Sequence, residues 1–115
     1  MTLVFNLLKG VLLTAVFIGL SGVASAQSAQ VQQGEKVYQA QKCSICHAVA
    51  GVGNKKGSLD KVGAKLSAAD LRSWIVDAEG MTAKTKAERK PVMKSYPKLE
   101  KGDVDALVAY MQSLK

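Results

Sequence analysis

Histidine is the scarcest reactive residue in this chain, because His47 is the only one among 115 residues. The nucleophile and general-base constellations of hydrolases are absent, since no second histidine is available to build them. Cysteine is almost as scarce, with only Cys43 and Cys46. The chain also lacks internal repeats and any nucleic-acid recognition motif, so nucleic acid is a poor candidate partner. The chemistry of this protein is therefore concentrated in very few side chains.

These rare residues are clustered in the stretch Cys43-Ser44-Ile45-Cys46-His47. This spacing is that of a c-type haem attachment site. Two thiols three positions apart can both reach the vinyl groups on one edge of a porphyrin. His47 follows directly and can present its imidazole to the iron from one face. The motif therefore predicts one covalently bound haem c, held by Cys43 and Cys46 and ligated by His47.

Three other sites could use the same residues. Zinc needs about four ligands, and two cysteines with one histidine are one short, although a carboxylate could complete the set. A thioredoxin-like pair should follow a strand within a βαβ pattern, whereas the residues before Cys43 look helical and no such alternation follows. A disulfide between the two cysteines is the third alternative. Haem attachment fits the motif and its context best.

Aromatic residues make up only 5% of the chain. After position 26 they are Tyr38, Trp74, Tyr96 and Tyr110. This is little material for the core of a small domain, and domains of this size are marginal on packing alone. A buried haem would supply the missing apolar mass.

Residues 1–26 resemble a secretory signal peptide. Lys9 precedes an apolar run from Val11 to Leu20, and Ala24-Ser25-Ala26 is an A-x-A cleavage signature. We therefore expect a leader at 1–26, one domain at 27–115 and a periplasmic location, where haem is joined to such cysteines. The apolar residues before Lys9 leave an uncleaved membrane anchor as an alternative, although the run is shorter than the ~20 residues of a spanning helix.

Basic residues outnumber acidic residues by 16 to 9. Many of them gather between positions 84 and 101, where only Glu88 and Glu100 oppose them. General solubility is one explanation. A patch of this kind also steers docking to an acidic protein surface, with strong salt dependence. The basic members of the stretch are Lys84, Lys86, Arg89, Lys90, Lys94, Lys98 and Lys101.

Three segments have the apolar period of a helix. The first, 31–42, leads directly into Cys43. The second begins at Ser67, an N-cap followed by Asp70 at the third helical position, and we expect it to stop at Gly80. The third covers 104–114.

The connections between these helices are long. Residues 48–66 are rich in glycine and predict a loop wrapped around the cofactor. Residues 81–98 form a lysine-rich connection that contains Pro91 and Pro97. The sequence therefore predicts an all-α fold, with three main helices and long loops around one haem.

A single histidine excludes two histidine ligands within one monomer, so the other axial ligand is methionine or absent. Ligation by methionine and histidine raises the reduction potential. Met111 lies on the apolar stripe of the last helix, where packing is its expected role. Met81 directly follows Gly80, and Met93 lies in the loop between the prolines, well placed to fold over the open haem face.

The order of these pieces resembles that of small class I monohaem cytochromes c, and the resemblance runs from about Val31 to Lys115. The pieces that match are Gly34-x-x-x-Tyr38, Cys43-x-x-Cys46-His47, Leu71-x-x-Trp74-Ile75, Met93-x-x-Tyr96 and the run from Asp105 to Tyr110.

The resemblance implies the cytochrome c fold, in which the first and last helices cross at near right angles with Gly34 and Tyr38 against Tyr110. It implies Met93 as the distal ligand, ahead of Met81. Trp74, Tyr96 and Leu59 are expected to line the haem pocket, although packing on its own helix is an equal alternative for Trp74.

One departure from the family concerns the support of His47. The family often carries a Gly-Pro pair whose carbonyl accepts a hydrogen bond from this histidine. Here the stretch is Lys56-Gly57-Ser58-Leu59, without proline. Such contacts orient metal ligands, and the residue that supplies this one stays open.

The expected function is that of a monomeric, periplasmic one-electron carrier rather than an enzyme, with redox proteins of acidic surface as partners. One alternative is a membrane-anchored cytochrome, or a small subunit of a redox complex. Another is a haem peroxidase or gas sensor, which would require an open sixth position on the iron.

Overall fold

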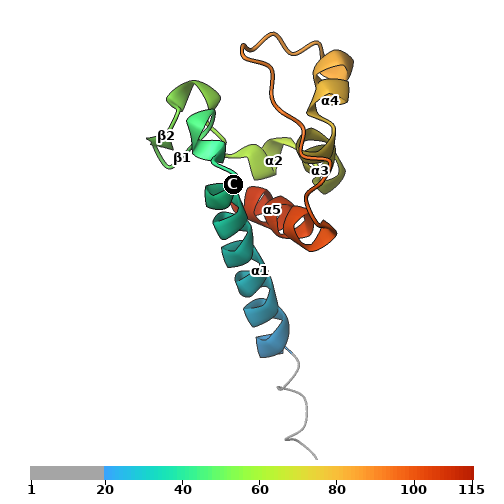
Figure 1. Ribbon diagram of the computed structural model, residues 1–115. Coiled ribbons are helices and arrows are strands. Elements are labelled where there is room, and N and C mark those ends of the chain that lie inside the picture. The colour runs from blue at the N-terminus through green and yellow to red at the C-terminus, as the bar shows by residue number, and fades with distance from the viewer. Residues whose placement is uncertain (1–19) are drawn as a thin grey trace, which may run out of the picture.

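The computed structural model describes residues 20–115, and most of its regular structure is helical (Figure 1). The helices are α1 (Leu20–Ala40), α2 (Val62–Lys65), α3 (Ala68–Val76), α4 (Ala78–Thr85) and α5 (Lys101–Ser113). The strands β1 (Ala48–Val49) and β2 (Val52–Gly53) form a minimal antiparallel hairpin with Ala48 opposite Gly53. The all-α prediction is confirmed, and long loops connect the helices.

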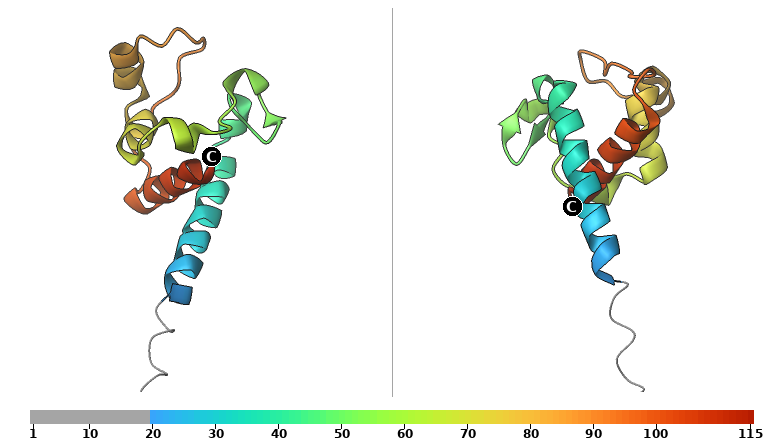
Figure 2. Two further views of the ribbon diagram at one scale, coloured as in Figure 1. Left: turned by 180° about the vertical axis from the view of Figure 1, so that it is seen from behind. Right: turned by 60° about the horizontal axis from the view of Figure 1, so that its bottom comes forward.

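The helices α1 and α5 cross at a steep angle, and all views agree that α5 packs across α1 (Figures 1 and 2). Gly34 is buried at the crossing, where a Cβ atom would overlap the carbonyl oxygen of Ala106 and the Cβ of Tyr110. The rings of Tyr38 and Tyr110 meet edge to face, with centroids 5.6 Å apart. Glycine is thus the residue that lets the two helix backbones come this close.

α1 begins well before the expected start at residue 31 and ends at Ala40, two residues early. It runs without a break through Ala24-Ser25-Ala26, the signature on which the leader prediction rests. Most of the predicted leader, residues 1–19, lies outside the described residues. Within residues 20–115, no helix has the length and apolar character that crossing a membrane requires.

The expected second helix is in fact two helices. α3 begins as predicted, since the Ser67 hydroxyl accepts a hydrogen bond from the Asp70 amide at 3.1 Å. It ends at Val76 because Asp77 leaves the helical conformation and its carboxylate accepts from the Gly80 amide at 3.1 Å. This contact caps α4, so the prediction that Gly80 ends the helix was wrong: Gly80 lies in the first turn of the next one.

The two predicted loops contain more local structure than their composition indicates. The segment 48–66 holds the hairpin, a 3₁₀ turn at Lys55–Gly57 and the short α2. The segment 81–98 starts inside α4, and the chain is irregular only after Lys86, which adopts a left-handed conformation with φ of 54°. Its far end is fixed to α3 by a hydrogen bond from the Tyr96 amide to the Ile75 carbonyl, 2.8 Å long.

The core lies where α1, α3 and α5 meet. A cation on α3 reinforces the contact, because Arg72 pairs with Asp105 of α5, which also accepts from Lys101 at 2.7 Å. The buried cluster comprises Val37 and Tyr38 of α1, Leu71 and Ile75 of α3, and Val104, Leu107, Val108, Tyr110 and Met111 of α5.

Candidate functional site

A cavity of about 500 Å³ opens above α5, between the segment that follows α1 and the α3–α4 side of the molecule. Its walls are mainly apolar, and its volume falls within the ~300–1,000 Å³ of small-molecule and cofactor sites. With the exception of the alternative ligand Met81, the residues that the sequence singled out for the site all line this cavity. They are Cys43, Cys46, His47, Leu59, Trp74, Met93 and Tyr96.

The cysteines and the histidine are presented by a tight turn. Lys42 adopts a left-handed conformation, with φ of 56°, and so breaks the direction of α1. A 3₁₀ turn at Cys43–Ile45 follows, and the His47 amide donates to the Cys43 carbonyl at 2.9 Å. Both thiols are free; Cys43 is half-buried and Cys46 is exposed. Burial raises the pKa of the Cys43 thiol above its usual value.

The imidazole of His47 is oriented by Gly57. Its Nδ1 lies 2.9 Å from the Gly57 carbonyl oxygen. Since a carbonyl only accepts, Nδ1 carries the proton and Nε2 keeps its lone pair for a metal. Gly57 thus supplies the hydrogen-bond acceptor that the sequence left open.

The surroundings of His47 also favour its neutral form. Burial lowers the pKa of the imidazole below its usual value, and the nearby Arg89 charge lowers it further, while the hydrogen bond to Gly57 acts in the opposite direction. Neutral imidazole is the form that binds metals.

The three methionines of the described chain occupy different environments. Met93 lines the cavity from the loop after α4, and Met111 lines it from α5, where it is part of the buried cluster. Met81 is buried within α4 and does not line the cavity. Only Met93 therefore combines access to the cavity with a position in a loop.

Sequence reasoning missed Arg89 as a residue of the site. It was counted only as one cation in a basic stretch, although its guanidinium donates to the Cys46 carbonyl at 2.5 Å. The one signal available was that Arg89 is the single arginine among lysines. Apolar wall residues such as Val62, Leu66 and Leu107 were also missed, because a lining residue looks like any core residue in sequence.

The zinc alternative receives no support from the geometry. Among residues 20–115, no three side chains of His, Cys, Asp or Glu come together as a metal site would require. The two thiols and His47 therefore find no carboxylate to complete a tetrahedral set.

Comparison with known families decides between the remaining alternatives. The model of the family described as "Cytochrome c" matches residues 31–115, the same part of the chain that the resemblance covers. The chain belongs to the cytochrome c family. Its fold is the cytochrome c fold, and membership implies a covalently bound haem c and haem-based electron transfer.

One curated relative of this cytochrome c is "Cytochrome c oxidase subunit 2" of Alkalihalophilus pseudofirmus. The two are 32% identical over 92 residues, which cover 72% of this chain and 25% of the relative. The chain thus spans about a quarter of the length of that protein. No solved structure matches the chain.

The residues of this cytochrome c fit the haem that the family implies. Two thiols stand at the wall of a mainly apolar cavity, the free Nε2 belongs to a histidine in the same wall, and a thioether is available in the loop. Sulfur and imidazole nitrogen are the donors that haem iron takes in cytochromes c.

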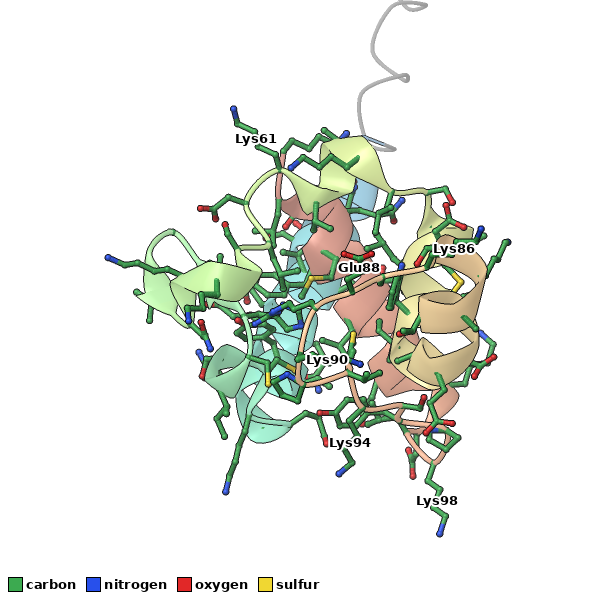
Figure 3. All side chains as sticks on the ribbon, turned by 90° about the horizontal axis from the view of Figure 1, so that it is seen from above. Lys61, Lys86, Glu88, Lys90, Lys94 and Lys98 are labelled. Carbon is green, nitrogen blue, oxygen red and sulfur yellow. The ribbon has the colours of Figure 1, made fainter. Side chains whose placement is uncertain are left out.

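The surface of the loop beyond α4 is strongly basic. Seen from above, Lys86, Lys90, Lys94 and Lys98 follow one another along it, with Glu88 among them, while Lys61 lies at the opposite border (Figure 3). Lys94 also lies over the ring of Tyr96, with its Nζ 5.5 Å from the centroid.

Proposed function

We propose that this protein is a one-electron carrier of the periplasm and not an enzyme, with haem c bound through Cys43 and Cys46 and ligated by His47 and Met93. The bound haem supplies a one-electron change at its iron. The observation that carries the proposal is that His47 and Met93, which are far apart in sequence, line the same cavity.

The chain's own residues support this role in three ways. The Gly57 carbonyl keeps Nε2 of His47 available, because it accepts a hydrogen bond from the protonated Nδ1. Met93 lines the cavity and, as the sixth ligand, would occupy the position that a substrate or gas needs, which argues against an enzyme or a sensor. Leu59, Trp74 and Tyr96 contribute to a largely apolar wall that limits water, and a drier site raises the reduction potential.

The absorption spectrum of the oxidised protein tests the ligand set. We expect a far-red methionine–iron band in the wild type, which Met93→Ala loses while its reduction potential falls, because the thioether favours ferrous iron. Met81→Ala is the matched control and should keep the band and the potential. Loss of the band only in Met81→Ala would move the ligand to that residue.

A high-spin oxidised spectrum with avid binding of carbon monoxide or cyanide by the wild type would overturn the carrier proposal. In that case the sixth position is open, and a peroxidase or a gas sensor becomes the better assignment.

A tethered form is a second candidate, and the relative named as an oxidase subunit favours it. The chain would then act as a cytochrome domain anchored through residues 1–26, or as a small subunit of a redox complex. Mass spectrometry of the native protein distinguishes the two forms. A mass that starts at Gln27 with one haem supports the free carrier, and a retained N-terminus supports the anchored one.

The partners of the carrier are proposed to be redox proteins with acidic docking surfaces, with the protein itself a monomer. The lysines along the loop that carries Met93 support this, because like charge on one face attracts and orients an acidic partner (Figure 3). We expect the bimolecular electron-transfer rate with an acidic partner to fall at least ~10-fold from low to high salt. A rate that does not depend on salt would contradict the proposed docking surface.

A further inference from the structure

Arg89 touches two segments that serve His47 and the cysteines. Its guanidinium donates to the Cys46 carbonyl at 2.5 Å, across 43 residues of sequence. The same group lies against the α-carbon of Gly57, because a Cβ atom built there would overlap it. One side chain therefore contacts both the attachment segment and the residue whose carbonyl orients His47.

Arg89 belongs to the loop that carries Met93, and this loop has few other ties. One end is held by the hydrogen bond from the Ala87 amide to the Thr82 carbonyl, 3.1 Å long. The other end is held by Ser95, whose hydroxyl accepts from the Glu79 amide at 3.3 Å. Between them, over residues 88–94, the Arg89 bond is the only hydrogen bond recorded in the described chain.

The chemistry of arginine suits such a tie. Its planar fork carries several donors in a fixed arrangement and stays charged at every accessible pH. Hydrogen bonds with a charged donor are about twice as strong as neutral ones. Arg89 makes no ion pair within the described residues, so its charge is not committed to a carboxylate.

We infer that Arg89 is a positioning residue that fastens the Met93 loop to the haem-attachment segment and thereby keeps Met93 on the iron. The inference rests on the proposed function, in which Met93 is the distal ligand. Because the loop is held at its middle, an added ligand such as imidazole would replace Met93 at the iron only after the Arg89 hydrogen bond opens.

The alternative is that Arg89 acts only as one positive charge near the haem. Lys90 is the matched control, because it is the next residue of the same loop and no hydrogen bond or ion pair within residues 20–115 joins it to the attachment segment. Lys90→Gln and Arg89→Gln remove one charge each, but only Arg89→Gln removes the tie.

The experiment measures how fast imidazole displaces the methionine in the oxidised holoprotein. The loss of the far-red band monitors the displacement. We expect displacement to be ~10-fold faster in Arg89→Gln than in the wild type, as for the loss of one charge-assisted hydrogen bond. Lys90→Gln should stay within about twofold of the wild type, since an exposed charge alone contributes little. Amide hydrogen exchange over residues 88–94 should accelerate in Arg89→Gln only.

Arg89→Lys gives an independent test and serves if Arg89→Gln does not take up haem. It keeps the charge and one donor but loses the fork, so its displacement rate should lie between those of the wild type and Arg89→Gln. Displacement at the wild-type rate in Arg89→Lys, together with equal rates in Arg89→Gln and Lys90→Gln, would overturn the inference while leaving Met93 ligation intact. Absence of the far-red band in the wild type itself would instead remove Met93 ligation, and the inference with it.

Discussion

At the scale of a single residue, Gly57 connects His47, the proposed proximal ligand, to the rest of the chain. Its carbonyl accepts from His47 Nδ1 at 2.9 Å, and its α-carbon has no room for a side chain because the Cys46 carbonyl and Arg89 lie against it. In the family this acceptor is often the carbonyl of a Gly-Pro pair. Here the 3₁₀ turn at Lys55–Gly57 places the Gly57 carbonyl beside His47, where it accepts this hydrogen bond. Asn54 caps the turn, because its side-chain oxygen accepts from the Lys56 amide at 3.1 Å.

Gly57→Ala should therefore raise the reduction potential and lower stability. The added methyl pushes the turn away, which weakens the Nδ1–H bond, and a less basic imidazole stabilises ferric iron less. We expect a rise of a few tens of millivolts, below the ~59 mV of a tenfold change in a one-electron couple. The free energy of unfolding should fall by about 1–3 kcal/mol, as for other overpacked sites. Redox titration and denaturant unfolding of the holoprotein measure the two effects.

Ser58→Ala is the control for this substitution. Ser58 is exposed, and its hydroxyl accepts only from the Asp60 amide at 3.2 Å. The reduction potential of the Ser58→Ala variant should match that of the wild type. A larger shift in Ser58→Ala than in Gly57→Ala would argue that the residue in the place of the proline, and not the Gly57 carbonyl, tunes the iron.

At the scale of elements, the crossing of α1 and α5 fixes the floor of the site. Tyr38 and Met111 belong to the buried cluster of this crossing, and both also line the cavity. Burial raises the pKa of Tyr38 to about 12, so its hydroxyl stays protonated at neutral pH. Because Tyr38 and Met111 belong to both the helix contact and the cavity wall, a change in the packing of α1 against α5 alters the wall directly.

Gly34→Ala and Gly102→Ala should have effects of opposite sign, although the chemical change is the same. At Gly34 the new methyl would overlap Ala106 and Tyr110, and we expect a loss of about 1–3 kcal/mol or more. At Gly102, in the first turn of α5, nothing lies within 4 Å, so alanine should stabilise by up to about 1 kcal/mol through helix propensity. Equal denaturation midpoints for the two variants would contradict the close helix contact.

At the scale of the whole molecule, the cavity lies beside the buried cluster, in a place that hydrophobic side chains would fill in a larger protein. The buried side chains come mainly from α1, α3 and α5, while the cavity walls combine side chains of α3, α4 and α5 with residues of the segments 41–66 and 87–99. Apolar walls that enclose nothing lose their contacts outright. The haem is thus expected to be a structural part of this domain as well as its redox centre.

A chain that cannot attach haem should not fold cooperatively. In the double variant Cys43→Ser/Cys46→Ser, we expect loss of near-ultraviolet circular dichroism, binding of a hydrophobic dye and a broad thermal transition, because the domain is too small to be stable on packing alone. Met93→Ala, which keeps both thioether bonds, should retain a sharp transition at a lower temperature. A sharp transition at the wild-type temperature in the double variant would show that the polypeptide alone suffices.

The sequence by itself determined the features that depend on neighbouring residues. Cys43, Cys46 and His47 identify the cofactor because covalent attachment needs a fixed local spacing. Ser67 and Asp70 mark a helix start because the cap is closed within one turn. The apolar periods located α1, α3 and α5 for the same reason, whereas the helix crossing at Gly34 was implied by the family resemblance.

The tertiary structure decided what depends on where distant segments meet. Any backbone carbonyl could accept from His47, so nothing in the sequence distinguishes Gly57 from its neighbours. The break at Asp77 depends on a carboxylate that turns back to cap α4, and a helical period does not reveal it. The path of the loop after α4 likewise decides that Met93 lines the cavity while Met81 does not. It also decides the contact of Arg89 with Cys46 across 43 residues.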